Sequence, residues 1–176
     1  MGQVYEKAKL FSEDNLRRLR AAVKPHIPAD AIVATFGSYA RREASALSDI
    51  DYIIISNDPE SLSKPSEEVE EAIKSIVDIE PSPDGAFGKV IQRSDILKNL
   101  GGEQDSNQSL TLRLLLLLEG EWLAGEAHFN ELRRQLIERY WPDPIGWSGF
   151  NLSSCSALGL LPGQMTVLLR LLAQAR

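Results

Sequence analysis

Two aspartates separated by a single residue are the side chains of this sequence best suited to chemistry. Asp49 and Asp51 stand directly before residues 52–55, a Tyr-Ile-Ile-Ile run with the aromatic and β-branched composition of a buried strand. Because side chains alternate along a strand, both carboxylates are predicted to share one face at its start. Carboxylate oxygens bind Mg²⁺ and Mn²⁺ well. The spacing therefore predicts a site for one divalent cation or for a pair of them.

A Gly-Ser pair precedes the aspartates, with ten residues between Ser38 and Asp49. Gly37 would let the backbone approach a ligand closely, and Ser38 offers an N–H and a hydroxyl to phosphate oxygens. Residues 39–44 have helical composition and are predicted to begin a short helix whose N–H groups face the Gly-Ser turn. Arg41 lies in the first turns of that helix. It is a candidate for neutralising a triphosphate, and the alternative is that it only faces solvent.

The elements around this motif predict how it is positioned. Residues 32–36 have strand composition and lead directly into the Gly-Ser turn. Apolar residues at helical spacing predict one helix from Ser12 to Pro25 and another over residues 66–76. A last, edge strand is expected within residues 85–92. These elements predict an α/β (α+β) fold over residues 1–100, with a small mixed sheet and helices packed on it.

The order Gly37-Ser38, ten residues, Asp49-x-Asp51 resembles the signature of the nucleotidyltransferase superfamily, which includes DNA polymerase β. The pattern Gly-Ser-Tyr-Ala-Arg…Ser-Asp-Ile-Asp is most similar to the small bacterial members of that superfamily. The resemblance implies a polymerase β-like fold and a Gly-Ser turn that holds the triphosphate of an NTP. It also implies that the two aspartates bind Mg²⁺.

A third carboxylate, supplied by a strand after the helix over 66–76, is a further implication of this resemblance. Asp78 and Glu80 would share one face of a short strand. Asp84, in the turn that follows, is another alternative. Each of these side chains also fits an ordinary solvent-exposed acid, so the third carboxylate stays unassigned.

Composition narrows the class of partner and the compartment. The net charge is −6 at pH 7, whereas nonspecific binding to nucleic acid depends on a surplus of Lys and Arg. A nucleic-acid acceptor is therefore disfavoured, and a small molecule or a protein is expected.

The single Cys155 fits a reducing compartment, and the N-terminus lacks the apolar segment of a signal peptide, so we expect a cytoplasmic protein. The leucine run at 114–118 is too short to span a membrane.

Beyond residue 100 the sequence changes character twice. Residues 101–143 are predicted to form a helical appendage, with a buried leucine-rich helix over 110–118 and an amphipathic helix over 129–140. This segment resembles, more loosely, the helices that follow the catalytic domain in uridylyltransferases of nitrogen regulation. Residues 144–176 contain no acidic residue and form an atypical hydrophobic tail. The tail is either a helix that packs on the appendage or on a partner, or a truncated or frame-shifted end.

These features predict an enzyme that transfers a nucleoside monophosphate from an NTP to a hydroxyl acceptor by a two-metal mechanism. Asp49 and Asp51 would hold the ions, one lowering the pKa of the acceptor hydroxyl and the other neutralising the leaving pyrophosphate. The third carboxylate would complete the metal shell or act as general base. The alternative is a non-catalytic module of the same fold that senses nucleotides or binds a partner as an antitoxin does. The intact Gly-Ser turn and aspartate pair favour the enzyme, because mutually repelling carboxylates have no structural use.

Overall fold

The computed structural model of the chain describes residues 2–77, 90–98, 100 and 105–140. The elements, in chain order, are α1 (Gly2–Val23), η1 (Lys24–His26), β1 (Ile32–Thr35), α2 (Gly37–Ala40), β2 (Tyr52–Ser56), η2 (Pro59–Leu62), α3 (Ser63–Lys74), β3 (Val90–Gln92), α4 (Arg93–Leu97), α5 (Asn107–Leu118), β4 (Glu121–Ala124) and α6 (Glu126–Tyr140). The hydrophobic tail predicted over 144–176 lies outside the described residues.

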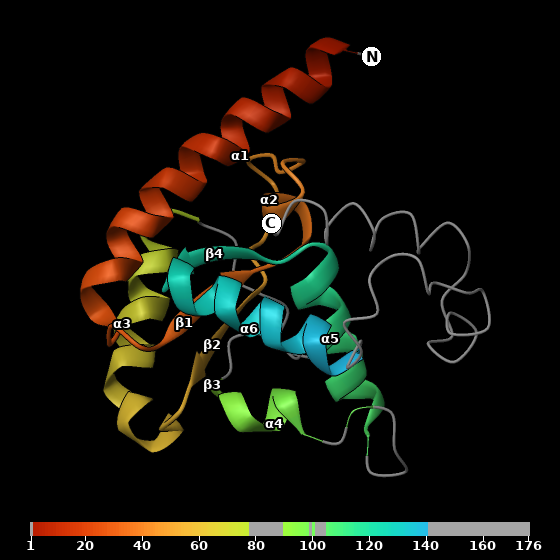
Figure 1. Ribbon diagram of the computed structural model, residues 1–176. Coiled ribbons are helices and arrows are strands. Elements are labelled where there is room, and N and C mark those ends of the chain that lie inside the picture. Colours follow the sequence, from red (N-terminus) through yellow and green to blue (C-terminus); the bar gives the residue numbers. More distant parts are fainter. Residues whose placement is uncertain (1, 78–89, 99, 101–104, 141–176) are drawn as a thin grey trace, which may run out of the picture.

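Four strands form one mixed sheet in the order β3-β2-β1-β4 (Figure 1). β1 runs antiparallel to β2, with Ile32 opposite Ile55 and Thr35 opposite Tyr52. β1 also pairs antiparallel with β4, whereas β2 and β3 are parallel. The predicted α/β fold, a small mixed sheet with packed helices, is confirmed. β3 is the edge strand expected within residues 85–92.

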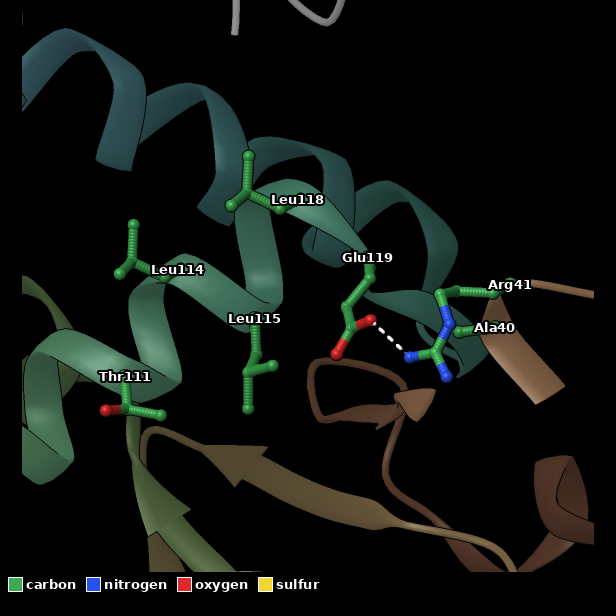
Figure 2. A pocket seen from close by; sticks show the side chains of 7 residues that line it. All are labelled: Ala40, Arg41, Thr111, Leu114, Leu115, Leu118 and Glu119. Atoms are coloured by element: carbon green, nitrogen blue, oxygen red, sulfur yellow. Dashed lines mark hydrogen bonds and ion pairs between the residues drawn. The ribbon is translucent and has the colours of Figure 1, made fainter. Parts of the chain in front are cut away.

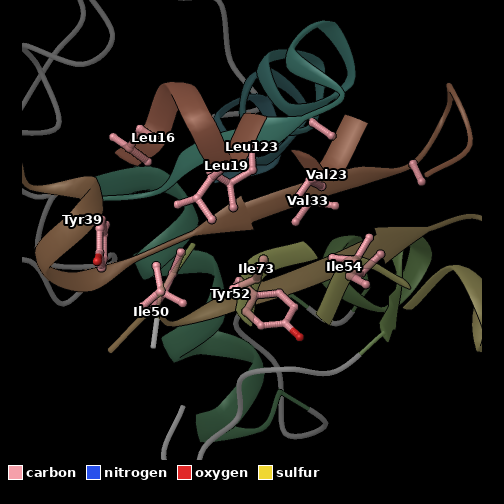
Figure 3. Close-up of a cluster of buried hydrophobic side chains, with 14 of the residues drawn as sticks. Leu16, Leu19, Val23, Val33, Tyr39, Ile50, Tyr52, Ile54, Ile73 and Leu123 are labelled. Carbon is pink, nitrogen blue, oxygen red and sulfur yellow. The ribbon is translucent and has the colours of Figure 1, made fainter. Parts of the chain in front are cut away.

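Both faces of the sheet are covered by helices, because β1 and β2 are apolar on both sides. On one face Val33, Tyr52 and Ile54 pack with side chains of α1 and α3 (Figure 3). On the other face Ile53 and Ile55 pack with side chains of α4, α5 and α6. Every residue of β1 and β2 is buried, as expected for strands between two helical layers.

The first helix begins earlier than the sequence predicts. The sequence places its start at Ser12, but α1 begins at Gly2. Ser12 is fully buried, and its Oγ donates to Ala8 O (2.7 Å) and accepts from Ala44 N (3.0 Å). The hydroxyl therefore ties α1 to the segment between α2 and β2. A serine followed by acids looks like a helix cap in sequence, and only this tertiary hydrogen bond shows its other role.

α5 is buried on one side only, although its leucine-rich composition predicts burial all round. Leu116 and Leu117 lie in the core, whereas Leu110 and Leu118 are exposed.

Among the residues that the structure describes, no helix is both long enough and apolar enough to cross a membrane.

β4 is a strand that the sequence analysis did not predict. It comes from the segment predicted as a helical appendage, and its register places Glu121 opposite Thr35 of β1. The boundary at residue 100 stays a prediction, but the segment beyond it contributes one of the four strands of the sheet.

Because β2 is buried on both faces, shortening one of its side chains should lower the free energy of unfolding. Ile54 is 1% exposed in the core of Figure 3, so Ile54→Ala should lower the free energy of unfolding by about 2–5 kcal/mol. Leu47, which is 85% exposed, is the matched control, and Leu47→Ala should change it by less than about 0.5 kcal/mol. Urea unfolding of both variants measures the difference, and equal effects would contradict this packing.

Candidate active site

The backbone of Asp51 is fixed at the point where β1 ends and β2 begins. Its carbonyl oxygen accepts a hydrogen bond from Phe36 N (3.0 Å) and another from Thr35 Oγ1 (2.8 Å). β2 begins at Tyr52, so both aspartates precede the strand at whose start they were predicted. Ile50, which lies between the two aspartates, is buried in the same core cluster as Tyr52. The shared face of the two carboxylates stays a prediction.

Gly37 lies directly against the side chain of Asp51. Its φ of +66° is in the left-handed region, which favours glycine. A Cβ built on Gly37 would lie 3.2 Å from Asp51 Oδ2, so a larger residue would crowd that oxygen. The turn and the carboxylate, which are fourteen positions apart in sequence, thus meet at one place.

The short helix after β1 differs from the predicted one. The sequence predicts it over residues 39–44, but α2 spans Gly37–Ala40 and includes the Gly-Ser pair itself. Arg42 ends the helix because its φ of +64° is left-handed. The turn is closed by backbone hydrogen bonds from Arg41 N to Gly37 O (3.0 Å) and from Glu43 N to Ser38 O (2.8 Å).

The electrostatics of Asp51 reveal which charges gather here. Burial raises the pKa of Asp51, and the negative charges of Asp49 and Glu119 raise it further, while Arg41 lowers it. The pKa of Tyr39 is also raised, by burial and then by the charge of Asp49. The charges of Asp49, Glu119 and Arg41 therefore lie close enough to Asp51 to shift its pKa.

Arg41 is held by two carboxylates. Its Nη1 donates to Glu119 Oε2 (2.7 Å) and its Nε donates to Glu43 Oε2 (2.9 Å) (Figure 2 shows the first pair). Because of these two ion pairs, the Arg41 side chain does not only face solvent. It is nevertheless 46% exposed, so a ligand can reach it. Sequence reasoning missed Glu119, because the Glu-Gly-Glu that follows the leucine run indicates only the end of that run.

A pocket of about 550 Å³ adjoins this ion pair (Figure 2). One side of it is an apolar wall from α5, and the other side is the end of α2. The lining residues are Ala40, Arg41, Thr111, Leu114, Leu115, Leu118 and Glu119. The pocket therefore places apolar surface next to the charged residues of the site.

The aspartate pair suits a divalent cation, whose charge would offset both the burial and the repulsion from neighbouring carboxylates that raise the pKa of Asp51. Because position 37 is glycine, no side chain fills the space there beside Asp51 Oδ2. In the part of the chain that the structure describes, no three His, Cys, Asp or Glu side chains are grouped closely enough to hold a metal ion. The predicted alternatives for a third carboxylate, Asp78, Glu80 and Asp84, lie outside the described residues.

Comparison with known protein families indicates which class of protein contains this site. Residues 16–99 match the family model described as a nucleotidyltransferase domain. This match supports the nucleotidyltransferase superfamily for that part of the chain, and the mixed sheet with packed helices is consistent with the polymerase β-like fold. The match supports nucleotidyl transfer as the general function, with an NTP as the substrate. No curated protein and no solved structure matches the chain.

The raised pKa of Asp51 predicts that this carboxylate destabilises the metal-free protein. An acid whose pKa is higher in the folded state loses stability as the pH rises from the unfolded pKa through the folded one. Asp51→Asn should therefore raise the melting temperature at pH 7, because it removes a carboxylate whose charged form the folded state disfavours. The gain should shrink as the pH falls and Asp51 becomes protonated in the parent protein.

Thermal unfolding between pH 4 and pH 8 in the presence of a chelator measures this effect. Asp58→Asn is the matched control, because Asp58 is exposed and lies two residues beyond the end of the same strand. A melting temperature that is unchanged or lowered at pH 7, or a gain that does not depend on pH, would contradict the electrostatic account.

Proposed function

We propose that this protein transfers a nucleoside monophosphate from an NTP to a hydroxyl group of a small molecule or a protein. The observation that carries the proposal is the contact of Gly37 with Asp51, which joins a turn suited to phosphate to a carboxylate suited to a cation. The family match over residues 16–99 supports the same class of reaction. The single Cys155 fits a reducing compartment, and we place the protein in the cytoplasm.

Each site residue has a defined task in this proposal. Asp49 and Asp51 would hold Mg²⁺ or Mn²⁺, which when bound would neutralise phosphate charge and lower the pKa of the acceptor hydroxyl. Gly37 and Ser38 would hold the β- and γ-phosphates, so that the α-phosphorus faces the acceptor in line. Arg41 would exchange a glutamate for a phosphate oxygen, a partner with which it forms strong hydrogen bonds.

The reaction forms one bond and breaks one. The acceptor oxygen bonds to the α-phosphorus, the bond from that phosphorus to the β-phosphate oxygen breaks, and pyrophosphate leaves as the hydroxyl proton is released. We place the acceptor at the pocket beside Arg41, where Leu114, Leu115 and Leu118 offer apolar surface. The net charge of −6 favours a small molecule or a protein over nucleic acid in that position.

Binding of an NTP should depend on a divalent cation and on both aspartates. Each of the four common NTPs, titrated with Mg²⁺ and with a chelator, should bind only in the presence of the metal. Asp49→Asn and Asp51→Asn should each weaken that binding by at least about tenfold, because each removes a charged ligand. Calorimetric titration measures the affinity, and circular dichroism checks that the variants remain folded. Equal binding by the double variant would exclude the site.

Transfer itself is tested with an NTP labelled at the α-phosphate. Incubation of the protein with a cell extract should label an acceptor, and the Asp51→Asn variant should not label it. Binding of the NTP without any transfer would favour the second candidate, a non-catalytic module that senses nucleotides or binds a partner.

Ser38 should contribute to binding of a triphosphate more than of a monophosphate. A hydroxyl that donates to a charged phosphate oxygen contributes about 1–3 kcal/mol, so Ser38→Ala should weaken NTP binding by about five- to 150-fold. Affinity for the corresponding nucleoside monophosphate should change much less. Ser61→Ala, at an exposed position of η2, is the control. Equal losses for both ligands would show that Ser38 does not contact the triphosphate.

A further inference from the structure

Two arginines directly after the Gly-Ser turn pair with two glutamates that flank Gly120. Arg41 Nη1 lies 2.7 Å from Glu119 Oε2, and Arg42 Nη2 lies 2.6 Å from Glu121 Oε2. Glu119 follows the last residue of α5, and Glu121 is the first residue of β4. Both glutamates lie outside the family match over residues 16–99. The segment between α5 and β4 thus holds the nucleotide-binding turn by two ion pairs.

The two pairs differ in exposure. The Arg42 and Glu121 side chains are 26% and 21% exposed, whereas the Arg41 side chain is 46% exposed. An ion pair that is more sheltered from water is less screened by solvent and salt. Arg41 is therefore the arginine that can exchange partners, and Arg42 is the one held in place.

Arg42 has an unusual backbone conformation that its side chain helps to hold. Its φ of +64° is left-handed, which is unfavourable for a residue with a side chain. Its guanidinium donates to Ala40 O (2.6 Å) as well as to Glu121. This conformation ends α2 and lets Glu43 N donate to Ser38 O (2.8 Å), so it sets the position of Ser38.

Glu121 is itself fixed from its other side. Its second carboxylate oxygen, Oε1, accepts from Arg20 Nη2 (2.8 Å). The Arg20 Nε donates to Trp122 O (3.2 Å), and its guanidinium lies 3.8 Å from the centroid of the Trp122 ring. Glu121 also lies opposite Thr35 in the sheet. The carboxylate that binds Arg42 is therefore anchored to α1 and to the end of β1.

We infer that Glu121 is a positioning residue for the nucleotide-binding turn. By binding the Arg42 guanidinium it holds the left-handed backbone at position 42, and this backbone holds Ser38 in the conformation that binds phosphate. The inference rests on the proposed function, because it assigns Ser38 to the triphosphate. It gives the segment beyond residue 100 a direct part in binding the NTP.

Glycine at position 42 provides the decisive test, because glycine adopts φ near +64° without help from a side chain. In the parent chain, Glu121→Gln should weaken Mg²⁺-dependent NTP binding by about three- to tenfold. In the Arg42→Gly background the same substitution should change binding by less than about twofold. Arg42→Asn, which also tolerates the left-handed region, serves if the glycine variant folds poorly. Glu138→Gln, which breaks an exposed pair with Arg134 on α6, is the control.

Hydrogen exchange of the Glu43 amide, measured by NMR on the ligand-free protein, tests the inference without any nucleotide. Glu121→Gln should speed this exchange in the parent chain but not in the Arg42→Gly background. Equal loss of NTP binding in both backgrounds, or unchanged exchange at Glu43, would overturn the positioning role. If the parent chain binds no NTP, the proposed function fails, and the exchange experiment still decides whether Glu121 positions the turn.

Discussion

The antiparallel pairing of β1 with β2 is the constraint on which the rest of the structure depends. Apolar side chains on both faces of these strands hold the two helical layers together. At the end of this ladder the Asp51 carbonyl accepts two hydrogen bonds, from Phe36 N and Thr35 Oγ1, which satisfies both of its lone pairs. The backbone of the sheet therefore fixes the position of Asp51.

The charged side chains that influence Asp51 include more carboxylates than cations. Burial, Asp49 and Glu119 all raise the pKa of Asp51, and Arg41 is the cation that opposes them. A site that concentrates like charges lowers the stability of the ligand-free protein, and such sites persist where function needs them. The pairing of Arg41 with Glu119 and Glu43 keeps the cation near the site.

The segment from α5 to β4 is part of this arrangement even though it lies beyond the matched domain. β4 pairs with β1 and begins with Glu121, whereas α5 supplies the apolar wall of the pocket and is followed directly by Glu119. The family match thus supports nucleotidyl transfer as the general function. The neighbouring segment supplies the glutamates that pair with Arg41 and Arg42 and part of the lining of the adjoining pocket.

The sequence by itself determined the features that depend on neighbouring residues. These are the strand at 52–55, the spacing of the Gly-Ser turn from Asp49 and Asp51, and a helix predicted over 66–76, which the structure places at Ser63–Lys74. Alternation and helical periodicity are local patterns, so they can be read along the chain. Only the tertiary structure decided that Ser12 bonds Ala44 instead of capping a helix, that residues 121–124 form a strand, and that Glu119 reaches Arg41. Each of these outcomes depends on a partner that is distant in sequence, and no local pattern identifies that partner.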